Sequence, residues 1–445
     1  MKVVLGMRSR FSITLLLAGL TLLPRAAPLE AQEARRRWER LCTIRADKFD
    51  LVLPQAMREN GIDMWITMMK EGLLDPLWED LGRGYVGGPA YYIFADRGGD
   101  RVERVAAGVS GYMLEQCGVY DSIITGPFDL GRFVAARDPR RIGVNMSEQL
   151  GPADGLSHTN YQALMRALGE RYAARVVSAE KLISDYRSRR VASELVAFGE
   201  AAELSRTIAE QALSNRVITP GLTMLEDVAW WMWDQLLARG LGSSFDMPSV
   251  YITGPRGIEA TSNRRIIQRG DFMMIDWGVC FLNFCTDVKR VAYVLKPDET
   301  AAPPGLQHAF DRALAVRAAI RPVIRAGPTA AEIERAIHAR LEQSGFGVIA
   351  FNRPTDRDIT EVVVGAHSVG NTGHGIGPSI AFFNPLQLTY QIKPTNLFSF
   401  EFFAYTKVPE WGGAKARIPI EDDMVVTERG VEWLYPVVER ILLIR

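Results

Sequence analysis

Acidic residues stand inside two strongly apolar stretches of this sequence. Asp276 lies within Phe-Met-Met-Ile-Asp-Trp-Gly, and Glu401 lies within Leu-Phe-Ser-Phe-Glu-Phe-Phe. A carboxylate with such neighbours is expected to be buried, and burying a lone charge is costly unless the group is protonated, paired or bound to a metal. Both acids therefore need a chemical explanation.

The spacing between Asp276 and Asp287 supplies part of that explanation. The two residues are eleven positions apart, so on one straight strand they would lie roughly 36 Å apart on opposite faces. If the chain turns near residues 281–283, they become cross-strand neighbours with Cβ atoms about 5 Å apart. Two carboxylates that close repel each other, and a multivalent cation is the usual remedy.

Glu401 and Glu421 form a second acidic pair, and His374 lies in Gly-His-Gly-Ile-Gly, where glycines allow close backbone approach. Four carboxylates and one imidazole suit Mn, Co, Zn or Fe, and bridging carboxylates favour two ions. Glu421 alone would also fit a surface cluster with Asp422 and Asp423, and His374 alone would fit a structural loop histidine. Taken together, the five residues favour a metal site.

The elements that must hold these residues form a faint internal repeat. Four residues recur 106 positions later, namely Ile218, Gly221, Thr223 and Glu226 as Ile324, Gly327, Thr329 and Glu332. In both copies Thr-x-x-Glu predicts a capping box at the start of a helix. Chance similarity between two amphipathic helices is the alternative to a duplication.

Each repeat helix is followed by a pair of predicted strands. The first pair spans 271–279 and 284–295, and the second spans 397–405 and 417–426. The sequence thus predicts an α+β domain of two similar halves over one curved sheet.

The region before the repeat, about 35–183, alternates helices and strands. A helix over 49–60 is ended by Gly61, and strands are expected at 62–68 and 91–95. This region contains no compact set of metal-binding or nucleophilic residues. We therefore expect the chemistry to lie in the second domain, with boundaries at 32–185 and 186–445.

Residues 1–31 have the pattern of a secretory signal peptide. Lys2, Arg8 and Arg10 precede an apolar run at 11–23, and small alanines follow it. The run is shorter than the ~20 apolar residues of a membrane-spanning helix. An uncleaved N-terminal anchor is the alternative. Export predicts a secreted or periplasmic protein that has no membrane contact after cleavage.

Composition narrows the class of protein. The 445 residues carry 52 Lys plus Arg against 52 Asp plus Glu, and only five His and four Cys. A zero net charge without a basic stripe argues against a nucleic-acid partner. Four cysteines are too few for a small disulfide scaffold. Function must therefore be sought in a local site.

An oxidising compartment would allow the four cysteines to pair. In the register that places Asp276 opposite Asp287, however, Cys280 and Cys285 lie diagonally across the turn. That separation disfavours a disulfide, so the sequence predicts two free thiols at 280 and 285.

The motifs Asp276-Trp-Gly-(eight residues)-Asp287, Gly-His374-Gly-Ile-Gly, Glu401 and Ile-Glu421-Asp-Asp-Met resemble those of the pita-bread metallopeptidases. This family includes methionine aminopeptidase, aminopeptidase P, prolidase and the metal-free creatinase. The resemblance covers 186–445, and the preceding region is similar to the smaller α/β creatinase-like domain of the aminopeptidase P and prolidase branch. It implies an α+β fold whose C-terminal domain duplicates a helix pair plus antiparallel strands.

The resemblance also implies a function. Asp276, Asp287, His374, Glu401 and Glu421 would hold two divalent ions, Mn first and Co, Zn or Fe as alternatives, sharing a hydroxide. Glu401 would be the general base, and His367 would stand in for missing substrate-side histidines. The expected protein is an exported aminopeptidase that removes the residue before proline from a peptide and that forms a homodimer.

Several positions depart from the family pattern. The usual histidine before the first strand is missing from 257–265, and a second histidine, normally seven residues after the ligand histidine, is missing from 378–384. Phe402-Phe403 replaces Pro-Gly, and Pro419 replaces an arginine. We expect altered specificity or a reduced rate. Hydrolysis or lyase cleavage of a non-peptide C–N bond and a catalytically weak metal-bound binding module are the alternatives.

Overall fold

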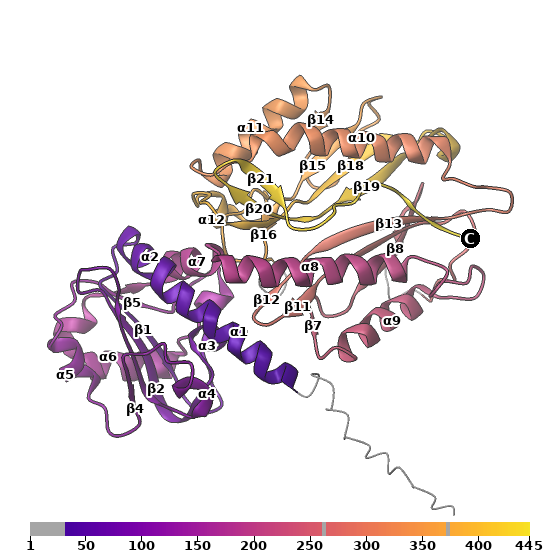
Figure 1. The fold of residues 1–445 in the computed structure, drawn as a ribbon. Coiled ribbons are helices and arrows are strands. Elements are labelled where there is room, and N and C mark those ends of the chain that lie inside the picture. Colours follow the sequence, from indigo (N-terminus) through magenta and orange to yellow (C-terminus); the bar gives the residue numbers. More distant parts are fainter. Residues whose placement is uncertain (1–31, 260–263, 371–373) are drawn as a thin grey trace, which may run out of the picture.

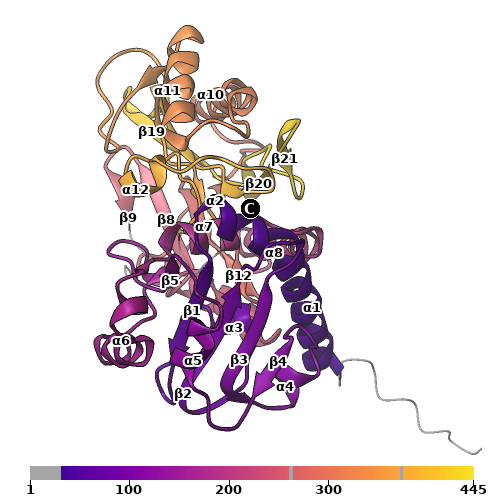
Figure 2. The ribbon, with the colours of Figure 1, turned by 90° about the vertical axis from the view of Figure 1, so that its left-hand side faces the viewer.

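The computed structural model describes residues 32–259, 264–370 and 374–445. The predicted signal peptide at 1–31 and part of the 257–265 segment lie outside these ranges. The described chain folds into two domains that lie side by side, with α1 and α7 near their junction (Figure 1, Figure 2). None of its described helices combines the length and apolar character needed to span a membrane.

The N-terminal domain is built on a six-stranded mixed sheet with the order β4-β3-β2-β1-β5-β6. Its strands are β1 (Met64–Met69), β2 (Tyr85–Ala95), β3 (Glu103–Ser110), β4 (Ser122–Ile124), β5 (Ile142–Val144) and β6 (Val176–Ser178). Its longer helices are α1 (Glu33–Asp47), α2 (Leu53–Glu59), α5 (Leu130–Ala135), α6 (His158–Ala173) and α7 (Glu180–Ser188), and its one-turn helices are α3 (Trp78–Leu81) and α4 (Tyr112–Glu115). The predicted helix at 49–60 is formed by a π-helical turn (Lys48–Val52) that continues into α2, and the predicted strands at 62–68 and 91–95 correspond to β1 and the end of β2.

Both faces of this sheet are covered, which explains why all of β1 is buried. Alternate side chains of a strand point to opposite faces. Accordingly, Met64 and Ile66 join a core with α5 and α6, whereas Trp65 joins a second core with α2 and α7. Each face of the sheet therefore has its own apolar core.

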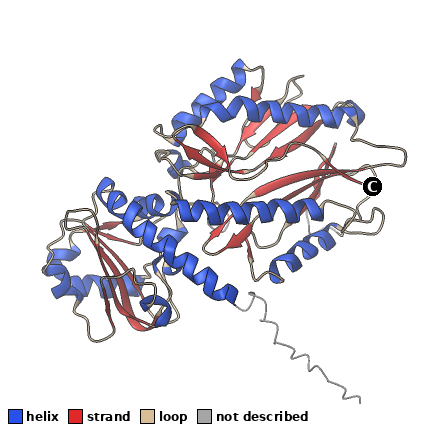
Figure 3. Cartoon of the chain, viewed as in Figure 1, coloured by secondary structure: helices blue, strands red, loops and turns tan. Residues whose placement is uncertain are grey.

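The C-terminal domain consists of two halves, each with outer helices and inner strands (Figure 3). The first half contains α8 (Ala192–Ala212), α9 (Leu225–Leu237), β7 (Gly242–Ser243), β8 (Ser249–Gly254), β9 (Gly257–Glu259), β10 (Phe272–Trp277), β11 (Val279–Phe281), β12 (Phe284–Cys285) and β13 (Val288–Val294). The second half contains α10 (Pro304–Ile320), α11 (Ala330–Gln343), β14 (Gly347–Val348), β15 (Glu361–Val364), β16 (His367–Ser368), α12 (Pro385–Leu388), β17 (Leu397–Ser399), β18 (Phe402–Lys407), β19 (Lys415–Ile420), β20 (Asp423–Thr427), β21 (Gly430–Trp433) and β22 (Leu442–Ile444).

Hydrogen bonding divides the predicted curved sheet into shorter sheets. Their orders are β22-β13-β10-β8-β9, β12-β11-β7, β14-β15-β18-β19 and β16-β17-β20-β21. Short breaks between consecutive strands, such as the one between β10 and β11, separate these sheets. The α+β architecture predicted from the sequence is confirmed.

The two halves share the local structure that the repeat predicts. Gly221 and Gly327 both have a positive φ, 85° and 113°, which favours glycine. Their N–H groups donate to the carbonyls of Ile267 and Ile392 at 2.7 and 2.8 Å. These matched contacts support a duplication.

The predicted capping boxes are correct in one copy only. Thr329 and Glu332 form the box that begins α11. In the first copy the box is shifted by one residue, because the Asp227 carboxylate accepts a hydrogen bond from the Met224 N–H at 2.8 Å. Thr223 instead accepts a bond from the Thr219 N–H.

The hairpin between β10 and β13 has the predicted turn but a different register. Phe281 pairs with Phe284, and Leu282 between them has a φ of 56°. Asp276 therefore lies opposite Lys289, two residues beyond the predicted partner Asp287. The close approach of strands at Gly278, where a Cβ would lie 1.7 Å from the Thr286 carbonyl oxygen, fits this register.

The same register makes Cys280 and Cys285 direct partners. They form a disulfide with a Cα–Cα distance of 4.0 Å, so the prediction of two free thiols is wrong. The error has one physical cause, because a two-residue change in register turns a diagonal pair into an opposed pair.

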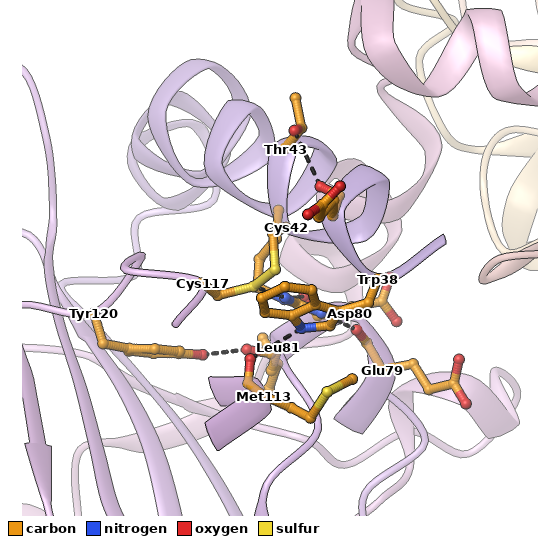
Figure 4. The surroundings of a disulfide bond; sticks show 11 residues. Trp38, Cys42, Thr43, Glu79, Asp80, Leu81, Met113, Cys117 and Tyr120 are labelled. Atoms are coloured by element: carbon orange, nitrogen blue, oxygen red, sulfur yellow. Dashed lines mark hydrogen bonds between the residues drawn. A yellow bond between two sulfur atoms is a disulfide. The ribbon is translucent and has the colours of Figure 1, made fainter. Parts of the chain in front are cut away.

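A second disulfide, Cys42–Cys117, fastens α1 to the N-terminal domain (Figure 4). Beside it, the Trp38 indole donates to the Met113 carbonyl at 3.1 Å. The other face of α1 reaches the C-terminal domain, where the Arg37 guanidinium donates to the carbonyls of Arg239 and Gly240 at 2.8 and 2.7 Å. Helix α1 thus ties the two domains together.

Candidate active site

The acids predicted to bind metal lie where strands are interrupted. Asp287 lies between β12 and β13, Glu401 between β17 and β18, and Glu421 between β19 and β20, while Asp276 is the penultimate residue of β10. At such breaks a side chain escapes the strict alternation of a strand. The duplicated halves therefore present their acids to a common space.

Backbone contacts join the two halves beside this space. The Lys289 N–H of the first half donates to the Glu421 carbonyl of the second half at 3.2 Å. The Asp287 N–H donates to the Asp423 carboxylate at 3.3 Å. These bonds fix the distance between the acids of the two halves.

His367, on β16, is buried among these acids. Its Nδ1 lies 3.0 Å from the Ser368 carbonyl oxygen, which accepts only, so Nδ1 carries a proton and Nε2 is the ring nitrogen that faces the acids. Nε2 lies 3.6 Å from Glu401 Oε2 and 3.7 Å from both Asp287 Oδ2 and Glu421 Oε1. His367 was predicted as a substrate-side group, yet it faces three of the predicted ligands.

Within the described ranges, the ligand atoms of Asp287, His367 and Glu421 all lie within 4.8 Å of one another. Asp287 Oδ1 is buried and has no hydrogen-bond partner there. A mixed set of carboxylate oxygens and one imidazole nitrogen suits Mn, Fe, Co or Zn. These residues thus fit a divalent metal ion.

His374, the predicted ligand, is placed differently. Its side chain is exposed, its ring centre lies 4.4 Å from that of His367 and 5.0 Å from that of Phe383, and it is not part of the converging group. It follows His367 by seven residues, the spacing expected between a ligand histidine and a substrate-side histidine. The geometry thus brings His367 rather than His374 among the acids.

Lys289 is a site residue that the sequence analysis missed. Its Nζ lies 3.0 Å from Asp276 Oδ2, 2.9 Å from Glu401 Oε1 and in close contact with Glu421 Oε2. The signal was present, because Lys289 interrupts Val-Lys-Arg-Val-Ala-Tyr-Val, a stretch that is buried throughout. The burial argument applied to Asp276 applies equally to this lysine.

Comparison with known proteins agrees with this geometry. The sequence model of metallopeptidase family M24 matches residues 197–428, just over half of the chain. The chain belongs to metallopeptidase family M24. It is therefore a metal-dependent peptidase, and its C-terminal domain has the pita-bread fold expected from the sequence.

Named relatives of this M24 metallopeptidase span most of its length. A Mycoplasma pneumoniae protein named "Putative Xaa-Pro aminopeptidase" is 26% identical over 280 residues, which cover 62% of this chain and 68% of the relative. Among solved structures, the X-Pro aminopeptidase of Thermotoga maritima has a TM-score of 0.62 at 18% identity, covering 87% of this chain and 99% of the other. The prolidase of Pyrococcus horikoshii has a TM-score of 0.58 at 16% identity, covering 89% and 99%. These structures show a shared fold across both domains.

Electrostatics in the M24 site reflect an excess of buried negative charge. Burial raises the pKa of Asp276 to about 7, against the effect of Lys289. Burial, followed by the nearby charges of Glu421 and Asp276, raises the pKa of Asp287 well above its usual value. Burial would raise the pKa of Glu421 too, but Lys289 and His367 lower it to about 2. A further cation would relieve the repulsion that remains around Asp287.

The two acids that follow Glu421, Asp422 and Asp423, help to hold its strand in place. Glu421, Asp422 and Asp423 are all fully buried, so a surface acidic cluster is excluded. Asp422 pairs with the Arg290 guanidinium at 2.9 Å and accepts a hydrogen bond from the Tyr435 hydroxyl at 3.1 Å. Such partners hold the ligand-bearing strand in place.

Proposed function

We propose that this M24 metallopeptidase is an exported aminopeptidase that hydrolyses the peptide bond between an N-terminal residue and a following proline. The observation that carries the proposal is the convergence of Asp287, His367 and Glu421 on one point, with Glu401 beside them. The names of its relatives support the preference for proline, and the two-domain fold shared with an X-Pro aminopeptidase agrees with it.

The donor set assigns roles to the two histidines. His367 would hold the metal ion together with Asp287 and Glu421, with Mn as the first candidate and Co, Zn or Fe as alternatives. A divalent ion bound there would polarise the scissile carbonyl and lower the pKa of a water molecule. His374 would then be the substrate-side histidine, because its exposed ring lies against that of His367.

Glu401 is the proposed general base, which would carry a proton from the attacking water to the leaving group. Its side chain is about one-tenth exposed, and its Oε2 lies 3.6 Å from His367 Nε2. Oε2 would accept the proton of the attacking water and then deliver it to the leaving proline nitrogen. His374 would donate a hydrogen bond to the carbonyl oxygen as negative charge develops on it.

Export to the periplasm or the medium is supported by the signal-like sequence of residues 1–31. The disulfides Cys42–Cys117 and Cys280–Cys285 agree with it, because such bonds persist in oxidising compartments. Homodimerisation stays a prediction.

A peptide panel tests the proposed specificity. Purified protein supplied with Mn²⁺ is incubated with Ala-Pro-Ala, Ala-Ala-Ala and Gly-Pro-Ala, and released residues are measured by mass spectrometry. We expect cleavage of the two proline peptides and little of Ala-Ala-Ala, and a loss of roughly 10²–10⁴-fold in kcat for Glu401→Gln. A protein that binds Mn²⁺ but cleaves no peptide would contradict the aminopeptidase and favour a non-peptide substrate.

A further inference from the structure

Lys289 places a permanent positive charge inside the metal site. Its side chain is only 5% exposed, and β13 sets it directly opposite Asp276 on β10. The Lys289 N–H donates to the Glu421 carbonyl, and the strand that carries Lys289 is hydrogen-bonded to β10. The lysine stem therefore enters the acidic space from a fixed point.

The ammonium group is surrounded as a metal ion would be. Asp276 Oδ2 and Glu401 Oε1 lie at 3.0 and 2.9 Å from Nζ, and Glu421 Oε2 makes the third contact. An ammonium has three N–H donors, and three carboxylate oxygens satisfy all of them with charge-assisted bonds. The space between these three oxygens is filled by Nζ.

In Glu401 and in Glu421, the two carboxylate oxygens face different groups. One oxygen of each contacts Lys289, and the other faces His367 Nε2, at 3.6 Å from Glu401 Oε2 and 3.7 Å from Glu421 Oε1. This is how bridging carboxylates would be shared by two cations, with the ammonium as one of them. The space bounded by Asp287, His367 and Glu421 fits a divalent ion.

One departure from the family pattern lies against the same lysine. Phe403, in the pair that replaces Pro-Gly after Glu401, has its ring centre 5.5 Å from Lys289 Nζ. An aromatic face attracts a cation, so it favours an ammonium that stays in position.

We propose that Lys289 takes the place of one of the two expected metal ions, so that the site binds a single divalent ion at Asp287, His367 and Glu421. The proposal rests on the metallopeptidase function proposed above. It replaces a two-ion centre with a centre of one metal ion and one fixed ammonium. A second divalent ion would have to displace Nζ from three carboxylates and lie beside its charge.

Metal stoichiometry tests the proposal without using activity. The full chain is stripped with a chelator and titrated with Mn²⁺, and bound metal per chain is measured by calorimetry and elemental analysis. We expect one Mn²⁺ for the wild type and two for Lys289→Ala, which frees Asp276, Glu401 and part of Glu421. Mn²⁺ electron paramagnetic resonance should show an isolated ion in the wild type. In the variant it should show a coupled pair, as expected for ions about 3.5–4 Å apart.

Two further variants control the experiment. Lys289→Arg keeps the positive charge, so we expect it to bind one Mn²⁺ ion. If Lys289→Ala fails to fold, this variant and the wild type still test the proposal, because two bound ions in either would contradict it. Lys415→Ala removes another buried lysine that is paired with an acid, Glu361, at 2.7 Å outside the site, and should also keep one ion. Two ions in the wild type, or one in a folded Lys289→Ala protein, would overturn the proposal and leave the peptidase function standing. Absence of any bound ion in every protein would overturn both.

Discussion

The rings of His367 and His374 are in contact, but their surroundings are opposite. His367 is 1% exposed and has its Nδ1 held by a backbone carbonyl, whereas His374 is exposed. Part of the His374 residue is accessible, but its ring packs against those of His367 and Phe383. This partial burial of the ring, followed by the charge of His367, lowers the pKa of His374 to about 4. One ring is built into the acidic site, and the other borders it.

This difference predicts separable effects of the two histidines. His367→Ala should weaken Mn²⁺ binding at least about 100-fold, because a ligand is lost. His374→Ala should keep Mn²⁺ affinity within about threefold and lower kcat roughly 100-fold, because a hydrogen bond to developing charge is lost. Calorimetric titration with Mn²⁺ and kinetics on Ala-Pro-Ala measure the two effects.

His308→Ala, on the exposed face of α10, is the matched control and should change neither quantity. If His374→Ala lost the metal while His367→Ala kept it, the ligand assignment made from the sequence would be right and the geometric one wrong.

The sequence identified the acids of the site because charge inside an apolar strand is conspicuous. It predicted His374 as the metal ligand and His367 as the substrate-side group, whereas the geometry places His367 among the acids. Both lie in one glycine-rich stretch, where spacing alone does not say which ring enters the site. Lys289 is also a charge inside an apolar strand, but its role as a partner of the acids depends on the pairing of that strand with Asp276. Contacts made across strands are not visible in local sequence.

Among the elements, the hairpin at 272–294 shows how register shapes the site. Its turn was predictable, but a two-residue change in register keeps every side chain on the same face, so the alternation of apolar residues cannot detect it. Turn geometry at Leu282 and the close approach at Gly278 accompany the observed register. That register pairs Cys280 with Cys285 and Lys289 with Asp276.

The two disulfides should contribute unequally to stability. Cys42–Cys117 closes a sequence separation of 75 residues and Cys280–Cys285 one of 5. Because a cross-link restricts the unfolded chain more when its loop is longer, replacing both cysteines by alanine should cost about 4 kcal/mol for the first and about 2 kcal/mol for the second. Urea unfolding followed by circular dichroism measures both losses. Equal losses would contradict this account of the unfolded chain.

A buried carboxylate near β15 should make stability depend on acid pH. Burial would raise the pKa of Glu361, but hydrogen bonds from Lys415, Thr355 and Arg357 lower it to about 2. The stabilisation is complete above the ordinary glutamate pKa, near 4.3, and is lost as pH falls through the folded value. Between pH 4.5 and 2 the wild type should lose about 2–3 kcal/mol of unfolding free energy more than Glu361→Gln does.

Unfolding by urea at a series of pH values checks this prediction. Glu342→Gln, an exposed position on α11, is the control and should follow the wild type. Parallel curves for the wild type and Glu361→Gln would contradict the cause assigned to the shift.

At the scale of the whole molecule, α1 links the domains. It is held to the N-terminal domain by Cys42–Cys117 (Figure 4) and to the C-terminal domain through the hydrogen bonds of Arg37. The sequence predicted two domains and their classes, because hydrophobic periodicity reports elements. It gave no sign of the contacts between them, which depend on side chains far apart along the chain.

The proposed export can be tested with a reporter. Residues 1–31 fused to an enzyme that is active only outside the cytoplasm should yield activity and a shortened product. Replacing Leu15, Leu16 and Leu17 by arginine interrupts the apolar run and should abolish both. Equal reporter activity with and without the arginines would contradict export by this segment.

We propose that Asp287, His367 and Glu421 bind a metal ion that supports cleavage before proline. The most direct measurement is release of alanine from Ala-Pro-Ala by chelator-stripped protein before and after Mn²⁺ is restored, with Asp287→Asn measured alongside. We expect no release without metal, recovery with Mn²⁺ in the wild type, and no recovery in Asp287→Asn. Full activity in the stripped protein, or normal recovery in Asp287→Asn, would contradict this proposal.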